Sequence, residues 1–232
     1  DHCQFKHLDE ISPKLIDAFT NKISQAIKPV TVNTYLTTLK TVFETAVRWN
    51  YMAANPFKGI KLLRYEREIP KILEPPEIRA FFDASRHMAP ELTPLFEFYI
   101  LTGLRRAEAL RLEWQDVDFD RKVLTIRKTK SKRARFIYMI GRVKSILSAR
   151  RELRQPFNFK ENSVSRRFTQ ITRSIGIQGV SLKRLRSSFN TYSQEAGIST
   201  QVLTWIMGHV DERVNQVHYT GILNSVRDKL EK

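Results

Sequence analysis

Two cations, an imidazole and a phenol occur near the end of this 232-residue chain, as Lys183, Arg186, His209 and Tyr219. All of them lie on or beside short segments with helical periodicity. Cations bind phosphate oxygens, an imidazole transfers protons, and a tyrosine hydroxyl can act as a nucleophile. Together these groups could attack a phosphodiester without a metal ion. Each alone also fits a structural role, as part of a solvated helix face, a residue after a helix-capping glycine, or a core aromatic.

Arg105 and Glu108 form a second candidate pair, in the segment TGLRRAEALRLEW. A three-residue spacing places both side chains on one face of a predicted helix, where the carboxylate can orient the guanidinium toward a phosphate. Such pairs also occur on many solvent-exposed helices. The pair by itself therefore leaves the function open.

The charge of the chain indicates a polyanionic partner. The formal net charge is +16 and the pI is about 10.1. Residues 121–154 carry 13 basic residues and one acidic residue, which is three quarters of the excess, whereas residues 73–120 carry 5 basic and 10 acidic residues. Because cations that neutralise phosphates release bound counterions, this excess favours a nucleic acid.

The first part of the chain is predicted to be helical. One helix starts at Ser12, an N-cap that is followed by a proline, and a second starts near Thr31. The second helix cannot extend past the Asn-Pro pair at 55–56. Residues 57–76 lack periodicity and are rich in Lys, Arg and Pro, so they are predicted to be a linker.

The hydrophobic period changes from 3.6 to 2 in the middle of the chain. Residues 123–126 and 136–140 are predicted as two strands around the basic segment KTKSKRAR. Helical periodicity returns from Arg142 onward. The predicted fold class is therefore mainly α with a small antiparallel β-sheet or hairpin. A helical tail at 220–232 could pack on its own domain or on a neighbouring protomer, and the sequence leaves both open.

Composition narrows the class of protein further. The single Cys3 excludes an intrachain disulfide, and His2, Cys3 and His7 lack a fourth ligand at zinc-finger spacing, so no metal is expected. No segment approaches the roughly 20 apolar residues of a membrane span, and the N-terminus is unlike a secretory or transit signal. We therefore expect a cytoplasmic protein without a membrane partner.

Four stretches, in this order and spacing, resemble the tyrosine recombinase (phage integrase) family: TGLRRAEALRLEWQDVDFD, TKSKRARFIYM, SLKRLRSSF and MGHVDERVNQVHYTG. Residues 9–56 also resemble the helical core-binding domain of that family. The resemblance implies a helical, DNA-binding core-binding domain with its linker at 1–69. It implies an α+β catalytic domain at 70–232.

The resemblance also implies an active site. Its catalytic residues would be Arg105, Lys130, Lys183, Arg186, His209 and Tyr219, with Glu108 supporting the first arginine. Tyr219 matches the nucleophile, and Lys130 matches a mobile hairpin lysine that would act as general acid. Because Lys128, Lys130 and Lys132 alternate, only the match to the family pattern selects Lys130.

Two positions depart from the family pattern. Ser187 stands where a histidine is often found, and Tyr138 stands where a proline is often found. Neither change removes a group that the chemistry requires. Further contacts to DNA are expected from the exposed side of the second helix and from the hairpin, at Thr34, Thr38, Lys40, Lys128, Lys132, Arg133 and Arg135.

The implied activity is site-specific recombination of double-stranded DNA. Strands would be cleaved and rejoined through a covalent 3′-phosphotyrosine and exchanged through a Holliday junction. The resemblance implies a homotetramer on DNA, with accessory DNA-bending or directionality factors as further partners, and it implies no cofactor.

Three other functions are consistent with parts of the sequence. A type IB topoisomerase would use similar chemistry and rejoin the same strand. A non-catalytic DNA-binding protein would use Tyr219 only for packing. A metal nuclease could hold Mg²⁺ on the alternating Asp116, Asp118 and Asp120, although the basic residues already supply a metal-free site.

Overall fold

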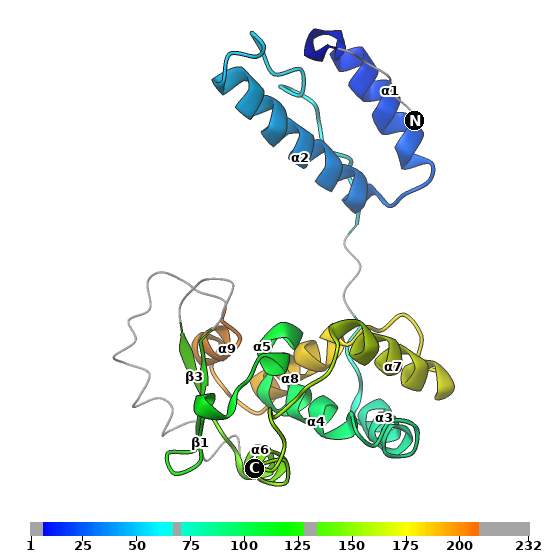
Figure 1. Ribbon diagram of the computed structural model, residues 1–232. Helices are drawn as coiled ribbons and strands as arrows, with labels where there is room; N and C mark the ends of the chain where they lie inside the picture. The colour runs from blue at the N-terminus through cyan, green and yellow to red at the C-terminus, as the bar shows by residue number, and fades with distance from the viewer. Residues whose placement is uncertain (1–6, 67–70, 128–133, 209–232) are drawn as a thin grey trace. The chain divides into compact units, whose positions relative to one another are not determined.

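The computed structural model describes residues 7–66, 71–127 and 134–208. The chain divides into two compact units, residues 1–69 and 70–232, called here the N-terminal and C-terminal units (Figure 1). Each unit has its own hydrophobic core. In the part of the chain that the structure describes, no helix is both long enough and apolar enough to cross a membrane.

The N-terminal unit is built on a pair of neighbouring helices. They are α1 (Pro13–Ser24) and α2 (Pro29–Arg48), preceded by a 3-10 turn, η1 (Leu8–Glu10). Both α-helices start with proline, whose fixed φ suits the first turn and whose missing N–H would have no helical partner there. The predicted N-cap is confirmed, since Ser12 Oγ accepts a hydrogen bond from the Leu15 amide at 3.3 Å.

Two asparagines hold the chain after α2 against that helix. Asn33 bonds both backbone groups of Leu63, donating to the carbonyl at 2.9 Å and accepting from the amide at 2.8 Å. Asn55 donates to a carbonyl of α2 at 3.0 Å and accepts from the Phe57 amide at 2.9 Å. Phe57 is only 3% exposed. The linker predicted at 57–76 is therefore wrong in its first part, which is irregular in conformation but packs into the core.

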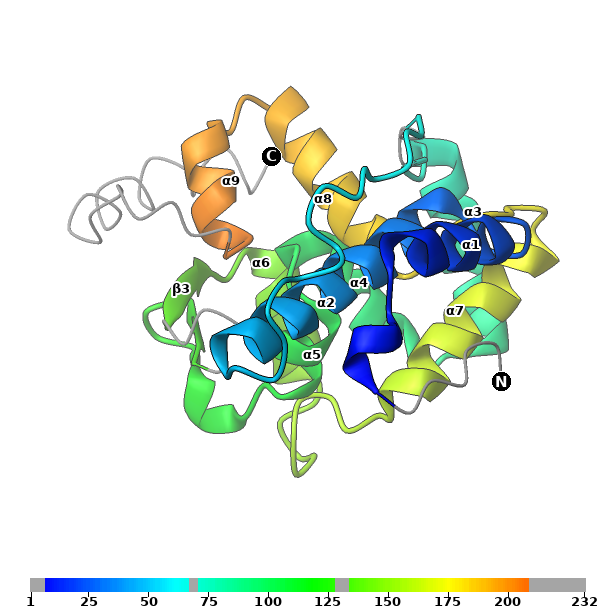
Figure 2. The same ribbon diagram turned by 90° about the horizontal axis from the view of Figure 1, so that it is seen from above.

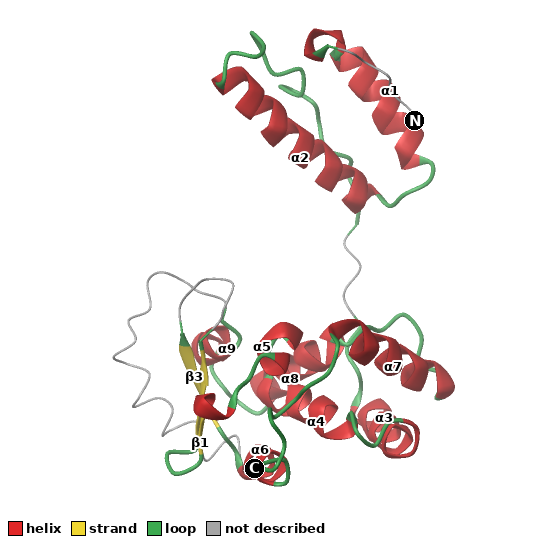
Figure 3. Cartoon of the chain, viewed as in Figure 1, coloured by secondary structure: helices red, strands yellow, loops and turns green. Residues whose placement is uncertain are grey.

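The C-terminal unit combines helices with a small sheet (Figure 3). Its helical elements are α3 (Pro75–Met88), α4 (Thr93–Thr102), α5 (Arg106–Leu110), η2 (Trp114–Asp116), α6 (Gly141–Ser148), α7 (Glu161–Ser174), α8 (Lys183–Glu195) and α9 (Thr200–Ile206). Its described strands are β1 (Val117–Asp118), β2 (Val123–Ile126) and β3 (Arg135–Tyr138). They form an antiparallel sheet in the order β1-β2-β3.

The sheet confirms the two predicted strands and adds a third. β2 and β3 pair so that Leu124 lies opposite Ile137 and Ile126 lies opposite Arg135. β1 was not predicted, because two residues are too few to show a period of 2. Along β3, Arg135 and Ile137 are buried while Phe136 is 46% exposed. Strand alternation therefore places Arg135 on the core face.

Helix α4 lies at the centre of the unit because buried apolar and aromatic side chains cover most of its surface. The ring of Phe96 contacts Phe81 of α3 and Phe168 of α7, with centroid distances of 5.3 and 5.9 Å. The helix ends at Gly103, which has a φ of +60°, and a Cβ there would lie 2.3 Å from Cδ1 of Phe189 in α8. Glycine thus lets α8 approach the turn that leads into α5.

Candidate active site

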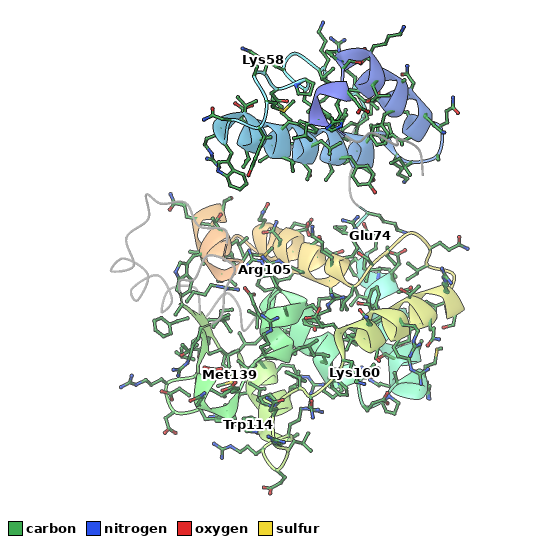
Figure 4. All side chains as sticks on the ribbon, turned by 45° about the horizontal axis from the view of Figure 1, so that its top comes forward. Lys58, Glu74, Arg105, Trp114, Met139 and Lys160 are labelled. Carbon is green, nitrogen blue, oxygen red and sulfur yellow. The ribbon has the colours of Figure 1, made fainter. Side chains whose placement is uncertain are left out.

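Arg105, which is labelled in Figure 4, lies at the start of α5. The carboxylate of Glu108 holds it there. The Arg105 backbone amide donates to Oε2 at 2.9 Å, and its Nη1 donates to Oε1 at 2.9 Å. The Glu108 carboxylate therefore caps the N-terminus of α5 and also orients the Arg105 guanidinium. The Arg105 side chain is 33% exposed, whereas that of Glu108 is 4% exposed. The arginine is thus open to a ligand while its counter-ion is not.

Glu108 also binds a second arginine, Arg135 of β3. Nη1 of Arg135 donates to Oε1 at 3.0 Å, and Nη2 donates to Oε2 at 2.8 Å. Burial raises the pKa of Glu108, but the hydrogen bonds and charge of Arg135, together with the hydrogen bonds of Arg105, outweigh it and hold this pKa below its usual range. The buried carboxylate therefore stays ionised at neutral pH.

Arg135 corrects one prediction from the sequence. It was expected to contact DNA from the basic hairpin, but its side chain is 5% exposed and its Nε donates to the Ile206 carbonyl at 2.8 Å. It shares the inward face of its strand with Ile137 and Met139. The expected DNA contact at Arg135 is therefore wrong, and strand alternation is the signal that could have revealed it.

Arg186 is a buried cation on the first turn of α8 and is 9% exposed. Its Nη1 donates to the Gly103 carbonyl, and its Nη2 donates to the Met207 carbonyl at 2.5 Å. Burial and the neighbouring charge of Arg105 lower the pKa of Arg186 to about 10, against the opposing effect of Glu108. The guanidinium therefore stays charged at neutral pH, and its orientation is fixed by backbone carbonyls.

Helix α9 lies beside β3 (Figure 2). The backbone carbonyls at the end of α9 bind all three of these arginines. The three consecutive carbonyls of residues 206–208 each accept a hydrogen bond from a different arginine, in the order Arg135, Arg186 and Arg105. The last carbonyls of a helix lack helical partners and attract cations. Gly208 has a φ of +64°, and a Cβ there would lie 2.8 Å from Nη1 of Arg135. Glycine at this position therefore allows the close approach.

Arg105 and Arg186 line one cavity of about 460 Å³ together with Lys183, the first residue of α8. The other lining residues are Tyr99, Leu104, Arg106, Ala107, Glu161 and Leu182. The Glu161 carboxylate is paired with Arg106 Nη2 at 2.7 Å. The cavity is thus lined by two arginines that protein acceptors hold in place and by a lysine, which are the cationic donors that a phosphate group requires.

Tyr99 lies in the same cavity but is unsuited to act as a nucleophile. It is 2% exposed, and its hydroxyl donates to the Arg106 carbonyl at 3.3 Å. Burial also raises the pKa of its hydroxyl. A tyrosine nucleophile for this cavity must therefore come from another part of the chain.

The structure brings together Arg105, Glu108, Lys183 and Arg186 from segments that are far apart in the sequence. The other predicted catalytic and hairpin residues lie outside the described residues, and they are Lys128, Lys130, Lys132, Arg133, His209 and Tyr219. The predicted tail at 220–232 lies outside them as well. The helix-capping position of Gly208 was predicted, but the close approach of Arg135 to Gly208 and of Phe189 to Gly103 was not, because neither approach follows from a pattern of charge or periodicity.

Thr34, Thr38 and Lys40 lie on the exposed side of α2 in the N-terminal unit. The Thr34 hydroxyl donates to the Val30 carbonyl at 2.9 Å, and the Thr38 hydroxyl donates to the Thr34 carbonyl at 2.8 Å. Each hydroxyl proton is therefore engaged within the helix, and the oxygen lone pairs face outward. Contact of these residues with DNA stays a prediction.

Folding brings the basic segment 121–154 onto the acidic segment 73–120. Within the described parts of the chain, four arginine–carboxylate pairs join the two segments, and they are Arg121–Asp118, Arg127–Asp116, Arg135–Glu108 and Arg142–Glu97. Part of the positive charge therefore neutralises the domain itself. Among the described residues, no group of three or more His, Cys, Asp or Glu side chains is placed to hold a metal ion.

Comparison with protein families places this site in a known context. The profile of the phage integrase family matches residues 71–224, and that of the phage integrase SAM-like domain matches residues 2–64. IntQ of Escherichia coli K12 is 38% identical over 103 residues, which cover 44% of this chain and 25% of IntQ. Tyrosine recombinase XerA of Saccharolobus solfataricus is 22% identical over 206 residues, which cover 87% of this chain and 67% of XerA.

Solved structures show the same fold. A lambda integrase dimer bound to a COC′ core site superposes with a TM-score of 0.78 at 17% identity, covering 92% of this chain and 84% of that chain. A lambda integrase tetramer bound to a Holliday junction gives a TM-score of 0.77 at 18% identity, covering 90% and 68%. The matched profiles extend over both units, and the chain belongs to the phage integrase family of tyrosine recombinases, with a SAM-like core-binding domain and a catalytic domain.

Proposed function

We propose that this protein is a site-specific DNA recombinase that cleaves and rejoins strands through a covalent 3′-phosphotyrosine at Tyr219. The observation that carries this proposal is the cavity in which Arg105 and Arg186 are fixed beside Lys183. The chain spans 25% of the length of IntQ and 67% of the length of XerA. The activity proposed for the whole protein therefore rests on this site and not on those relatives.

The two arginines would stabilise the charge that develops during the reaction. Attack on a phosphodiester places additional negative charge on the non-bridging oxygens. Arg105 and Arg186 are already held by protein acceptors, so little reorganisation is needed when that charge appears. Each such donor contributes on the order of 3 kcal/mol, or about 10²–10³-fold in rate.

Tyr219 would supply the nucleophile and Lys130 the general acid, as the family pattern implies. The tyrosine oxygen forms a bond to phosphorus, and the bond to the 5′-oxygen breaks. Because a phenol titrates near pH 10, its proton must leave during attack, toward His209 or Lys183. Lys130 protonates the departing oxygen, which leaves a 3′-phosphotyrosine and a free 5′-hydroxyl. Attack by another 5′-hydroxyl reverses these steps, so rejoining needs no ATP.

The assembly would contain four copies of the chain on two specific DNA sites. Strands would be exchanged in two steps through a four-way junction, with accessory DNA-bending or directionality factors assisting. The lambda integrase tetramer bound to a Holliday junction supports this arrangement, because it has the same fold. The protein would act in the cytoplasm, where it associates with DNA.

A suicide substrate tests the chemistry directly. A duplex carrying the repeat that flanks the encoding element is nicked so that cleavage releases a short 5′-hydroxyl strand and traps the covalent adduct. The wild type should form the adduct in EDTA, and Tyr219→Phe should form none. Tyr192→Phe is the matched control, since that hydroxyl donates to the Leu73 carbonyl at 2.8 Å and should not affect the adduct.

The same substrate separates the competing functions. Failure of the wild type to form an adduct would contradict the proposal and favour a non-catalytic DNA-binding protein. Adduct formation with relaxation of supercoiled DNA, but without resolution of a synthetic four-way junction, would favour a type IB topoisomerase. Loss of the adduct in EDTA would indicate a metal-dependent reaction.

A further inference from the structure

Arg135 does not line the cavity of Arg105, yet it binds the same carboxylate. We propose that Arg135 is a positioning residue, which fixes the guanidinium of Arg105 through Glu108 and so sets the rate of strand cleavage without contacting DNA. The inference rests on the proposed function, because the orientation of Arg105 affects the reaction only if Arg105 acts on a phosphate.

Arg135 and Arg105 share the carboxylate of Glu108 in a specific geometry. A guanidinium that binds both oxygens of a carboxylate fixes the plane of that carboxylate. Arg135 binds Glu108 in this way, at 3.0 and 2.8 Å. The Arg105 side chain reaches Glu108 through Nη1, at 2.9 Å. The Arg105 backbone amide binds the other carboxylate oxygen at 2.9 Å. Arg135 and this amide therefore set the orientation of the carboxylate together, and the Arg105 side chain takes its orientation from the carboxylate.

Arg135 and Glu108 are far less exposed to solvent than Arg105 is. The side chains of Arg135 and Glu108 are 5% and 4% exposed, whereas that of Arg105 is 33% exposed. Bulk water therefore has little access to replace a missing donor at the carboxylate. If Arg135 is removed, the carboxylate can turn, and Arg105 is free to follow it or to move into solvent.

Arg135 also connects several elements of the C-terminal unit. Its Nε donates to the Ile206 carbonyl at the end of α9, and the Gly208 carbonyl accepts from Arg105 Nη2 at 3.0 Å. Arg135 is also the first residue of β3 and pairs with Ile126 of β2. One side chain thus links the base of the hairpin, the end of α9 and the carboxylate behind Arg105.

Arg127 offers a matched comparison on the same hairpin. It follows β2, is 54% exposed, and donates from Nε to Asp116 at 2.5 Å. It is also an arginine–carboxylate pair at the hairpin base, but among the hydrogen bonds of the described residues it makes none to Glu108. Loss of Arg127 should therefore leave the orientation of Arg105 intact.

Cleavage and binding are measured separately for Arg135→Met, Arg135→Lys and Arg127→Met. On the nicked duplex, Arg135→Met should lower the single-turnover rate by about 10²-fold, because a misplaced group loses most of its effect. The dissociation constant for the same duplex should not change.

Arg135→Lys keeps the charge without the two-pronged contact and should restore little of the rate. Arg127→Met should cleave like the wild type. A rate that is unchanged in Arg135→Met, or a loss of affinity that matches the loss of rate, would overturn the inference.

The pH profile distinguishes positioning from a purely structural role. Burial raises the pKa of Glu108, Arg135 is the main group that lowers it, and Arg105 and Arg186 are the other charged groups nearby. In Arg135→Met the pKa of Glu108 rises, so cleavage should decline on acidification at a higher pH than in the wild type. Adding Glu108→Gln should remove this shift. A wild-type profile in Arg135→Met would contradict the positioning role.

Arginine side-chain NMR on the DNA-free full chain tests the positioning step independently of activity. Rotation about the Nε–Cζ bond of Arg105 should be faster in Arg135→Met than in the wild type or Arg127→Met. Circular dichroism confirms folding, and Arg135→Lys serves if Arg135→Met does not fold. A wild type without adduct would refute the proposed function, whereas unchanged Arg105 rotation would refute the role of Arg135 itself.

Discussion

The arginine cluster of the C-terminal unit and the exposed side of α2 in the N-terminal unit are both candidates for contact with phosphate, but they are built in opposite ways. In the cluster, buried or half-buried guanidinium groups are held by Glu108 and by the carbonyls of residues 206–208. On α2, Thr34 and Thr38 stand in solvent and direct their hydroxyl protons to carbonyls one turn earlier.

This difference separates the requirements of chemistry from those of binding. A catalytic group must be oriented before the charge develops, which needs partners inside the protein and a low dielectric around them. A binding surface can remain solvated, because counterion release supplies much of its affinity. Changes in the cluster should therefore have large effects on stability or rate, and changes on α2 should have small ones.

The largest effect is expected from Glu108→Gln, which leaves the buried Arg135 without a counter-charge. Removing one partner of a buried ion pair costs about 3–5 kcal/mol, which urea unfolding would measure. Glu161→Gln is the control, because the Arg106 and Glu161 side chains are 38% and 41% exposed. Breaking that pair should cost less than about 1 kcal/mol. Equal losses in the two variants would remove the distinction between the buried and exposed pairs.

Acid should reproduce this effect in the wild type. Burial raises the pKa of Glu108, but Arg135 and Arg105 lower it below its usual range. The resulting stability is complete above the unfolded carboxyl's pKa of about 4.3 and is lost as the pH falls through the lower folded value. The free energy of unfolding should therefore decrease on acidification below about pH 4.3 more steeply in the wild type than in Glu108→Gln. Parallel curves would contradict the expectation.

Arg105→Lys tests the catalytic side of the comparison. Lysine keeps the charge but loses the planar fork that Glu108 and the Gly208 carbonyl orient. Single-turnover cleavage should fall by about 10²–10³-fold, with little change in affinity for the duplex. Arg111→Lys, an exposed position at the end of the same helix, should retain the wild-type rate. A loss of affinity as large as the loss of rate would show that Arg105 acts mainly in binding.

Gly208→Ala should have an intermediate effect on the cluster. Its φ of +64° disfavours alanine, and the new Cβ would lie 2.8 Å from Nη1 of Arg135. Together these costs are about 1–3 kcal/mol in thermal or urea unfolding. Gly179→Ala is a matched control, since Gly179 has a φ of +72° and nothing within 4 Å of its Cβ position. Similar losses in both variants would show that the backbone, and not the arginines, requires the glycine.

The smallest effect is expected on α2. Thr34→Val and Thr38→Val remove hydroxyls that already bond within the helix, so the free energy of unfolding should change by less than about 0.5 kcal/mol. Their affinity for duplex DNA should follow the wild type at all salt concentrations. Lys40→Met should instead lower the salt dependence of binding by about one unit of slope. A large loss of affinity in the valine variants would show that the threonines are specific contacts.

Features that depend only on residues nearby in the sequence could be predicted. The N-cap at Ser12, the strand at 123–126 and the contact between Arg105 and Glu108 all depend on residues close together in the sequence. Arg105 makes this contact as the N-cap of α5, and not from a helix face as predicted. Arg135 was placed wrongly, because its partner Glu108 is 27 residues away in the sequence and the basic hairpin around it suggested exposure to solvent. The alternation of inward and outward side chains along β3 indicated that Arg135 is buried. The prediction relied instead on the basic composition of the hairpin.

Counts of charge along the chain also gave only part of the answer. The excess at 121–154 predicted a positively charged surface, but Arg135 is buried and Arg142 is paired with Glu97 at 2.5 Å. Burial in irregular segments was also hard to predict. Phe57 has no periodic pattern of apolar residues around it in the sequence, and its side chain still packs into the core of the N-terminal unit. Contacts between residues that are distant in the sequence decide both the surface charge and the burial of Phe57. Patterns in a single sequence do not reveal such contacts.

The contact between the end of α9 and the arginines has a consequence for protein engineering. Its acceptors at residues 206–208 are backbone carbonyls, which every amino acid possesses. Most side chains of α9 could therefore be redesigned without deleting an acceptor. Inserting or deleting a single residue would instead rotate all of the carbonyls by about 100°, away from their donors. To keep these contacts, a designer must preserve the length of this helix more strictly than its amino-acid sequence.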